Sequence, residues 1–371
     1  MRIPLVDLGA QQREIDDEVK AGLDEVFGAT AFIGGPAVGR FEAAYAQYVG
    51  ATHCVGVANG TDAIELALRA VGVRPGGEVI LPANTFIATA EAVSRLGGVP
   101  VLVDVDPVHL LIDPAAVRAA VGPRTEAIVP VHLFGQLAAV EEIGKIAADA
   151  GVPMVEDAAQ AQGARREGRA AGSFGLAAGT SFYPGKNLGA AGDAGAVTTS
   201  DGEVARAVRV LGAHGSAAKY DHEVIGMNSR LDTVQAVVLE AKLRRLETWN
   251  DARRAAAARY EALLADVPGV TTPAVVPGNE DVWHLYVVQV DERDRVLAEL
   301  NAAGIGAGIH YPTPVHLTGA YAHLGHGAGA FPVAEAAADR IVSLPMFPHL
   351  TVEQQEAVVD RLSQAVRGSH G

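Results

Sequence analysis

In the stretch Ser181-Phe182-Tyr183-Pro184-Gly185-Lys186-Asn187-Leu188-Gly189, a lysine stands in a glycine-rich turn that follows a predicted buried strand. Lysine is rare in this chain, which has 5 lysines against 24 arginines. The neighbours of Lys186 are small or apolar, so we expect its amine to be buried. Burial disfavours the charged form of an amine and lowers its pKa, which frees the neutral amine to attack carbonyl groups and form Schiff bases.

The chain on both sides of this turn alternates between short apolar runs and helical patterns. Several runs are almost continuously apolar, as in strands that are buried on both faces. This alternation predicts a mostly parallel sheet covered by helices, with ligand-binding residues at the carboxyl ends of the strands. The predicted strands are 53–57, 78–81, 99–103, 127–131, 152–156, 179–183 and 195–199, and the predicted helices between them include 62–71, 87–96 and 140–150.

A second, smaller unit is predicted after this region. A long helical pattern from 231 to about 264 leads into it, and Pro268, Pro273 and Pro277 mark a loop. The remainder contains a predicted strand pair, 283–290 and 305–311, a helix over 292–303 and a terminal helix over 352–366. We therefore predict a large α/β domain over residues 1–245, including an N-terminal arm, and a small α+β domain over residues 246–371.

The composition narrows the class of protein. A hydrophobic content of 49% with 42 glycines in 371 residues fits a turn-rich α/β enzyme. The net charge of -15, without a basic patch, argues against a nucleic-acid partner. The single cysteine, Cys54, excludes an internal disulfide and fits a reducing cytoplasm. No apolar run approaches the roughly 18 residues of a membrane span, and the early Asp7 does not fit a signal peptide. We expect a soluble, cytoplasmic protein.

An acid stands at the end of another predicted strand. In Val155-Glu156-Asp157-Ala158-Ala159-Gln160, Asp157 taken alone would be read as a helix cap. Paired with Lys186 it has a more specific use, because a carboxylate can keep a pyridine nitrogen protonated. A Schiff-base lysine and such a carboxylate are the protein half of pyridoxal phosphate (PLP) chemistry. The sequence therefore predicts PLP as cofactor, with Gln160 placed to bond its phenolic oxygen.

A phosphate group needs hydrogen-bond donors, and one segment supplies them. Asn59, Gly60 and Thr61 follow the first predicted strand and open a helix, so backbone N–H groups and the helix dipole face an anion. The hydroxyls of Thr61 and Ser181 add donors. Phe86 begins the helix after the next strand and can stack on a flat ring.

The sequence argues against three other kinds of site: a P-loop, a dinucleotide-binding site and a metal site. Gly185-Lys186 resembles the end of a P-loop, but Thr180 and Asn187 stand where glycine and Ser/Thr are required. The run 325–330 matches a dinucleotide fingerprint but does not follow a strand within a βαβ unit. The 12 histidines form no metal-binding motif with each other or with Cys54, so we predict no metal site.

Taken in order, these motifs resemble those of the fold-type I PLP-dependent aminotransferases that act on nucleotide-linked keto-sugars. The match runs nearly from end to end. Its motifs lie at 4–8, 32–35, 41–42, 59–63, 84–86, 131–136, 156–160, 181–186, 228–231 and 310–317.

The resemblance implies a homodimer with composite active sites. Lys186 would be the Schiff-base lysine, Asp157 the partner of the ring nitrogen, and Gln160 the contact of the phenolic oxygen. The residues implied for stacking and phosphate binding are Phe86, Gly60, Thr61, Ser181 and, from the other subunit, Asn228. The residues implied to face the sugar nucleotide are Tyr183, Lys219, Tyr220, His310, Tyr311 and His316.

The resemblance also implies an activity: transfer of an amino group from L-glutamate to a dTDP-linked keto-deoxysugar, as in antibiotic biosynthesis. Tyr183 makes the lysine motif more similar to members that aminate C3 of a 3-keto-6-deoxysugar, since members acting at C4 more often carry histidine there. Gln162 departs from the family, in which many members carry histidine at that position.

Other members of this family leave alternatives open. A 4-keto-sugar aminotransferase, an inosose aminotransferase and an enzyme of aminohydroxybenzoate precursors share these motifs. A PLP-dependent sugar dehydratase would carry histidine in place of Lys186. A non-catalytic PLP-binding sensor on the same fold would not need the lysine, Asp157 and the phosphate site together.

Overall fold

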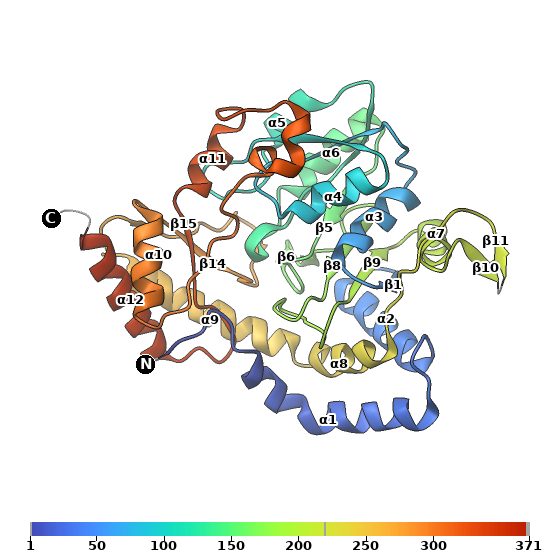
Figure 1. The fold of residues 1–371 in the computed structure, drawn as a ribbon, viewed down its shortest axis with the longest axis horizontal. Coiled ribbons are helices and arrows are strands. Elements are labelled where there is room, and N and C mark those ends of the chain that lie inside the picture. The colour runs from blue at the N-terminus through green and yellow to red at the C-terminus, as the bar shows by residue number, and fades with distance from the viewer. Residues whose placement is uncertain (1, 219, 369–371) are drawn as a thin grey trace.

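The larger unit of the computed structural model is built around a mixed sheet (Figure 1), and the structure describes residues 2–218 and 220–368. Four strands pair in the order β1-β9-β8-β5, and three in the order β3-β2-β4. Parallel bridges from Ile128 to Met154 and from Val131 to Asp157 join the two groups. The strands are β1 (His53–Val57), β2 (Glu78–Pro82), β3 (Val99–Val103), β4 (Thr125–Ile128), β5 (Val155–Asp157), β8 (Ala177–Ser181) and β9 (Gly195–Thr199).

The predicted mostly parallel sheet is confirmed. Only the pairings of β9, with β1 and with β8, are antiparallel among these seven strands. Each of the seven predicted strand segments overlaps one of them, and the bounds predicted as 53–57, 99–103 and 195–199 are those of β1, β3 and β9. The apolar run 127–131, for example, extends beyond the end of β4 at Ile128. Val131 lies outside the strand and forms an isolated bridge to Asp157.

Helices cover this sheet and connect its strands. Helix α3 packs on β8 and β9, α7 packs on β1 and β9, and α2 packs between β1 and α8. The helices of this part are α1 (Leu8–Ala29), α2 (Pro36–Val49), α3 (Gly60–Ala70), α4 (Ile87–Arg95), α5 (Pro114–Ala120), η1 (Leu133–Gly135), α6 (Val140–Ala150), α7 (Gly202–Gly212) and α8 (Thr233–Leu243).

Short antiparallel strands lie outside the main sheet. Strand β6 (Arg165–Arg166) pairs with β7 (Arg169–Ala170) and with β13 (Asn279–Glu280). Strands β10 (Ser216–Ala218) and β11 (Asp221–His222) form a hairpin that projects from the right side of the molecule in Figure 1.

The pattern predicted as one helix from 231 to 264 forms two helices, α8 and α9 (Leu246–Leu264). They separate because their buried faces have different partners. The apolar face of α8 packs against α1 and α2, whereas α9 packs against α12 (Val352–Arg367) and buries Tyr260 in a second core.

The C-terminal unit contains the sheet β12-β14-β15, formed by β12 (Val270–Thr271), β14 (Tyr286–Val290) and β15 (Ile341–Leu344). Helices α9, α10 (Arg293–Ala302) and α12 surround the core of this unit, which also takes in Ile3 of the N-terminal arm. The remaining helical segments are η2 (Val315–Leu317), η3 (Gly319–Leu324) and α11 (Pro332–Ala338).

The strand predicted over 305–311 is wrong. This segment makes isolated bridges, from Ile305 to Ile3 and from Gly308 to Ser343, and the antiparallel partners of β14 are β12 and β15. Glycine explains the difference: a Cβ at Gly306 would lie 2.7 Å from the backbone nitrogen of Leu5, so the segment lies against the N-terminal arm.

The domain boundary predicted after residue 245 falls between α8 and α9 and stays a prediction. Apolar packing continues across it, because Leu285, Val315 and Phe331 share a core cluster with Leu81 and Val93 of the large unit. Among the helices formed by residues 2–218 and 220–368, none is long and apolar enough to cross a membrane.

Candidate active site

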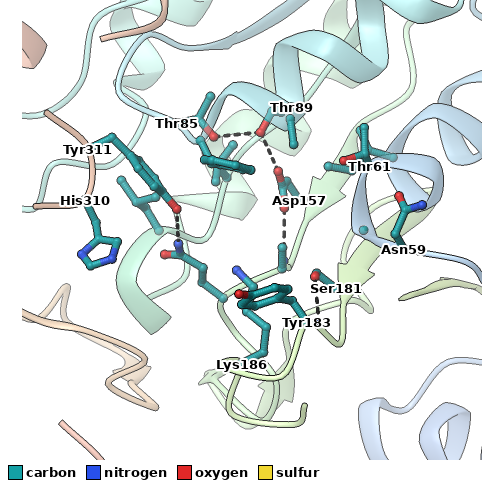
Figure 2. Close-up of a pocket in the computed structure, with 18 of the residues that line it drawn as sticks. Asn59, Thr61, Thr85, Thr89, Asp157, Ser181, Tyr183, Lys186, His310 and Tyr311 are labelled. Carbon is teal, nitrogen blue, oxygen red and sulfur yellow. Dashed lines mark hydrogen bonds between the residues drawn. The ribbon is translucent and has the colours of Figure 1, made fainter. Parts of the chain in front are cut away.

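A cavity of about 810 Å³ opens where β5 and β8 end, and it brings together most of the predicted site residues. Figure 2 shows the side chains pointing into it from the sheet, from the start of α3 and from the loop before η2. The predicted residues that line it are Gly60, Thr61, Phe86, Asp157, Gln160, Ser181, Tyr183, Lys186, His310 and Tyr311.

The turn that carries Lys186 is held tightly. The backbone N–H of Lys186 donates to the carbonyl of Tyr183 at 2.8 Å. A Cβ at Gly189 would lie 2.3 Å from the carbonyl oxygen of Pro184, so the turn can close only around glycine. Phe182 anchors the strand end, because its fully buried ring packs edge-on against Phe41 at 5.4 Å. The lysine side chain is therefore aimed from a fixed base into the cavity (Figure 2).

The environment of Lys186 fits a reactive amine. Burial lowers the pKa of its amine to about 8, and the charge of Asp157 opposes this shift. Burial also lowers the pKa of Lys242 to about 8, but that residue lies on α8 and not in the lining of the cavity. Position, rather than pKa, therefore distinguishes the two lysines.

Asp157 lies at the end of β5, where the predicted strand end placed it. It is 5% exposed, and burial raises the pKa of its carboxyl. Its Oδ2 accepts a hydrogen bond from the hydroxyl of Thr89 at 2.7 Å, and its Oδ1 accepts one from the N–H of Ala159 at 3.1 Å. These bonds and the charge of Lys186 oppose the effect of burial and favour the ionised carboxylate.

Thr89 belongs to a short directed chain of hydroxyls. Its oxygen lies 2.8 Å from the hydroxyl oxygen of Thr85, and both residues are buried. An ionised carboxylate only accepts hydrogen bonds, so the proton of Thr89 points to Asp157 and Thr85 donates to Thr89. Figure 2 shows this chain running from Thr85 through Thr89 to Asp157.

The predicted phosphate site is formed by the start of α3 and the end of β8. The side chain of Asn59 caps the helix by accepting from the N–H of Asp62 at 2.8 Å. A Cβ at Gly60 would lie 2.5 Å from the Cβ of Ser181, so glycine keeps this corner open. Backbone N–H groups at the first turn, with the hydroxyls of Thr61 and Ser181, suit a phosphate. Together with Lys186 and Asp157, these residues fit PLP.

The opposite wall is aromatic. The ring of Phe86 lies 5.1 Å from that of Tyr311, and Phe86 is 51% exposed. Gln160 is fixed at both ends of its amide, because Oε1 accepts from the N–H of Phe134 at 2.6 Å and Nε2 donates to the hydroxyl of Tyr311 at 3.0 Å. Burial raises the pKa of Tyr311, so its phenol stays protonated.

Sequence reasoning missed the role of Glu156, next to Asp157. This fully buried carboxylate accepts from the N–H groups of Gly172, Phe174 and Gly175 at 2.7–2.8 Å and lies 2.9 Å from Nε2 of His132. Burial alone would raise its pKa, but these hydrogen bonds hold the pKa below its usual value. Glu156 thus fixes the strand end that carries Asp157. The signal in the sequence was a second acid inside an apolar run.

Three of the predicted site residues that the structure describes are not brought into the cavity of this chain. Tyr220 is 83% exposed on the β10–β11 hairpin, and Asn228 is exposed and bridges to Ala213. His316 is buried, and its Nε2 lies 3.0 Å from a carboxylate oxygen of Glu335. Lys219 lies outside the described residues.

Gln162, the departure from the family pattern, is hydrogen-bonded to the end of β8. It is 1% exposed, and its Nε2 donates to the hydroxyl of Thr180 at 2.9 Å and to the carbonyl of Ser181 at 2.8 Å. Its place is therefore beneath the cavity rather than in its lining.

Comparison with known proteins agrees with this geometry. Residues 13–363 match the model of the DegT/DnrJ/EryC1/StrS aminotransferase family. The erythromycin biosynthesis sensory transduction protein EryC1 of Saccharopolyspora erythraea is 48% identical over 98% of this chain and 99% of its own. The dTDP-3-amino-3,4,6-trideoxy-alpha-D-glucose transaminase of Streptomyces venezuelae is 44% identical over 98% of this chain and 96% of its own.

A solved structure extends the match to the whole fold. The crystal structure of S. venezuelae DesV in complex with a ketimine intermediate has a TM-score of 0.96 at 44% identity and covers 98% of both chains. The predictions of a fold-type I enzyme, of aminotransferase activity and of PLP as cofactor are thereby confirmed.

Proposed function

Because the chain belongs to the DegT/DnrJ/EryC1/StrS aminotransferase family, we propose that it transfers an amino group from L-glutamate to C3 of a dTDP-linked 3-keto-6-deoxysugar. The observation that carries the choice of C3 is the lysine motif with Tyr183, taken with the 3-amino product in the name of the S. venezuelae relative. The side chain of Tyr183 is 60% exposed and stands beside Lys186 in Figure 2, where a phenol can bond a sugar hydroxyl.

The residues of this chain divide the work as follows. PLP, when bound, supplies a ring that absorbs the electrons released when a proton leaves carbon. Asp157 would hold the proton on the ring nitrogen, and the hydrogen bond from Thr89 favours the charged form of its carboxylate. The amine of Lys186, with a pKa of about 8, can take and return a proton near neutral pH. Thr61 and Ser181 would hold the phosphate, and Phe86 would cover the ring.

We propose further that the active site is completed by a second copy of this chain. Tyr220 and Asn228 are exposed and lie outside the cavity of their own chain. Apolar side chains near them in sequence are also exposed, Val224 at 50% and Ile225 at 91%. An interface between two copies would bury this surface and carry Asn228 to the phosphate and Tyr220 to the sugar of the partner.

Mixed dimers test the composite site. Lys186→Ala and Asn228→Asp chains would each be inactive alone, because each homodimer lacks one residue in both sites. A mixed dimer has one site in which both residues are wild type, so mixing the variants under exchange conditions should restore activity. If Lys186 and Asn228 acted in the same chain's site, mixing would restore nothing, and a fully active monomer in ultracentrifugation would also refute the proposal.

The substrate is tested with the purified holoenzyme. Glutamate should change the absorbance of the bound cofactor, and addition of a nucleotide-linked 3-keto-6-deoxysugar should reverse that change and yield an aminosugar by mass spectrometry. A panel of dTDP- and UDP-linked 3-keto- and 4-keto-sugars and an inosose separates the alternatives. Reversal by 4-keto-sugars alone would overturn the choice of C3.

A second candidate, a PLP-binding sensor, is favoured by the name of the S. erythraea relative, a sensory transduction protein. A sensor needs the cofactor but no turnover. The same assay separates the two, since a sensor would bind PLP and show no change in absorbance with glutamate.

A further inference from the structure

His284 is a pocket residue that the sequence motifs do not single out. It precedes β14, is 9% exposed, and lines the same cavity as Lys186. Its ring has two nitrogens with different neighbours. The Nδ1 lies 3.1 Å from Oδ1 of Asn187, the residue directly after the lysine.

The orientation of the Asn187 amide is fixed by a backbone carbonyl. Its Nδ2 donates to the carbonyl of Val282 at 2.9 Å and to Oδ1 of Asn250 at 2.9 Å. Asn250 is fixed in turn, because its Nδ2 donates to the carbonyl of Gln162 at 2.9 Å. A carbonyl oxygen only accepts, so Nδ2 of Asn187 must face Val282 and its Oδ1 must face His284.

This arrangement selects one tautomer of His284. An amide oxygen accepts hydrogen bonds, so Nδ1 of His284 carries the proton. Burial, with the charges of Lys186, Arg253 and His310, lowers the pKa of His284 well below its usual value, so the ring stays neutral. The Nε2 atom of a neutral ring protonated at Nδ1 is a pure acceptor. His284 lines the cavity, whereas the buried Asn187 that holds its Nδ1 does not, and from this we infer that the opposite, Nε2 edge of the ring is the edge offered to the cavity.

We propose that Nε2 of His284 accepts a hydrogen bond from a hydroxyl of the keto-sugar, and that His284 thereby distinguishes the sugar from the amino donor. The inference rests on the proposed function and names a specificity residue for it. A sugar presents hydroxyls that can donate to Nε2. The carboxylates of glutamate carry no proton at neutral pH and would meet the lone pair of Nε2 without a bond. Both substrates would thus bind in the same cavity, and the hydrogen bond to His284 would favour binding of the sugar over binding of glutamate.

The tautomer can be measured without any turnover. Nitrogen-15 NMR of the holoenzyme labelled at histidine, assigned with a His284→Asn sample, should show a neutral ring protonated at Nδ1 at pH 7. A ring protonated at Nε2, or at both nitrogens, would overturn the proposal, because neither offers an acceptor to the cavity.

Two substitutions of His284 separate its role as a hydrogen-bond acceptor from its structural bond to Asn187. In His284→Asn the side-chain amide can still donate to Asn187, but the acceptor at Nε2 is gone. In His284→Gln the longer side chain can place its carbonyl oxygen near the position of Nε2, while the bond to Asn187 is lost. A role as acceptor predicts that the Gln variant is the more active, and a purely structural role predicts the reverse.

The two half-reactions locate the effect. In His284→Asn, kcat/KM for the keto-sugar should fall roughly 10- to 100-fold, the usual result of losing a buried hydrogen bond. The glutamate half-reaction, followed by cofactor absorbance, should fall less than about threefold. Equal losses in both half-reactions, or no loss in either, would overturn the role of His284. If the wild-type protein aminates no sugar, the proposed function fails, whereas the NMR result still reports the tautomer.

Discussion

The cavity has two regions: a floor that includes Asp157 and Thr89, and an outer wall that includes Phe86 and Tyr183. They differ in how completely a single chain forms them. On the floor, Asp157 and Thr89 are buried and their polar atoms are paired within the chain. On the wall, Phe86 is 51% and Tyr183 60% exposed, and Tyr220 lies away from the cavity altogether. The polar groups of the floor are thus satisfied within one chain, whereas the wall is open, and in the proposed dimer a second subunit would complete it.

This difference separates chemistry from selection. In the proposed function, residues at strand ends hold the cofactor in a geometry that the sheet determines. Loops at the rim tolerate change and decide which substrate enters. Substitutions on the floor should therefore affect every substrate, whereas substitutions on the wall should affect one half-reaction.

The largest effect is expected for Lys186→Ala. Loss of the covalent anchor and of the proton carrier should reduce turnover at least roughly a thousandfold, since general acid–base catalysis alone contributes about 10²–10⁴. Steady-state assays with glutamate measure the loss, and circular dichroism shows whether the fold is retained. Lys242→Met is the matched control, because it removes a buried lysine that does not line the cavity; it should retain most of the activity. Substantial turnover by Lys186→Ala would break the distinction between floor and wall.

Asp157→Asn should bind PLP and lose most of its activity. The amide cannot hold the proton on the ring nitrogen, and loss of one such electrostatic partner typically costs on the order of 10²-fold. Both half-reactions should slow together, as expected of a floor residue. Turnover close to that of the wild type would mean that another acid has this role.

Thr89→Val tests the support of that acid with little change in shape. Loss of a hydrogen bond to a charged group costs about 1.5–3 kcal/mol. The bond from Thr89 lowers the pKa of Asp157, so its loss should raise that pKa. Protonation of Asp157 would then begin at higher pH, and the acid limb of the pH–rate profile should shift to higher pH. Thr85→Val should have a smaller effect, and none in the Thr89→Val background. An unshifted acid limb in Thr89→Val would contradict the directed chain.

The smallest effect is expected on the wall. Tyr183→Phe should weaken transition-state binding of the sugar by roughly 1–3 kcal/mol, the cost of an unpaired polar group. The spectrum of the free holoenzyme should not change, and the glutamate half-reaction should be much less affected. Stopped-flow measurement of each half-reaction decides the point. An equal loss in both would mean that Tyr183 belongs to the cofactor floor.

The floor could be predicted from the sequence because local patterns place its residues. Asp157 ends an apolar run, Gly60 opens a helix, and Lys186 follows a strand into a turn, and in each case the nearest few residues determine the structure. The partners that tune these groups could not be predicted in this way. Thr89 and Asp157 are separated by 68 residues, and Asn187 and His284 by 97, so only the folded chain brings them together.

The errors in the fold have the same origin. Helical periodicity continues from α8 into α9, and the break between them reflects two different packing partners. The segment 305–311 has the composition of a strand, but glycine lets it lie on the N-terminal arm instead. In the proposed dimer, Tyr220 and Asn228 would depend on contacts beyond the chain, whereas His316 is buried beside Glu335 and does not line the cavity.

The central claim is that position in the cavity, and not a lowered pKa, makes Lys186 the lysine that bonds the cofactor. Borohydride reduction of the holoenzyme followed by peptide mapping tests it directly, because reduction makes the bond to PLP permanent. Lys242 is the internal control, since burial lowers the pKa of its amine equally, to about 8. We predict the cofactor mass on the peptide that contains Lys186 and an unmodified peptide for Lys242. Label on Lys242 or Lys219, with Lys186 unmodified, would contradict the account.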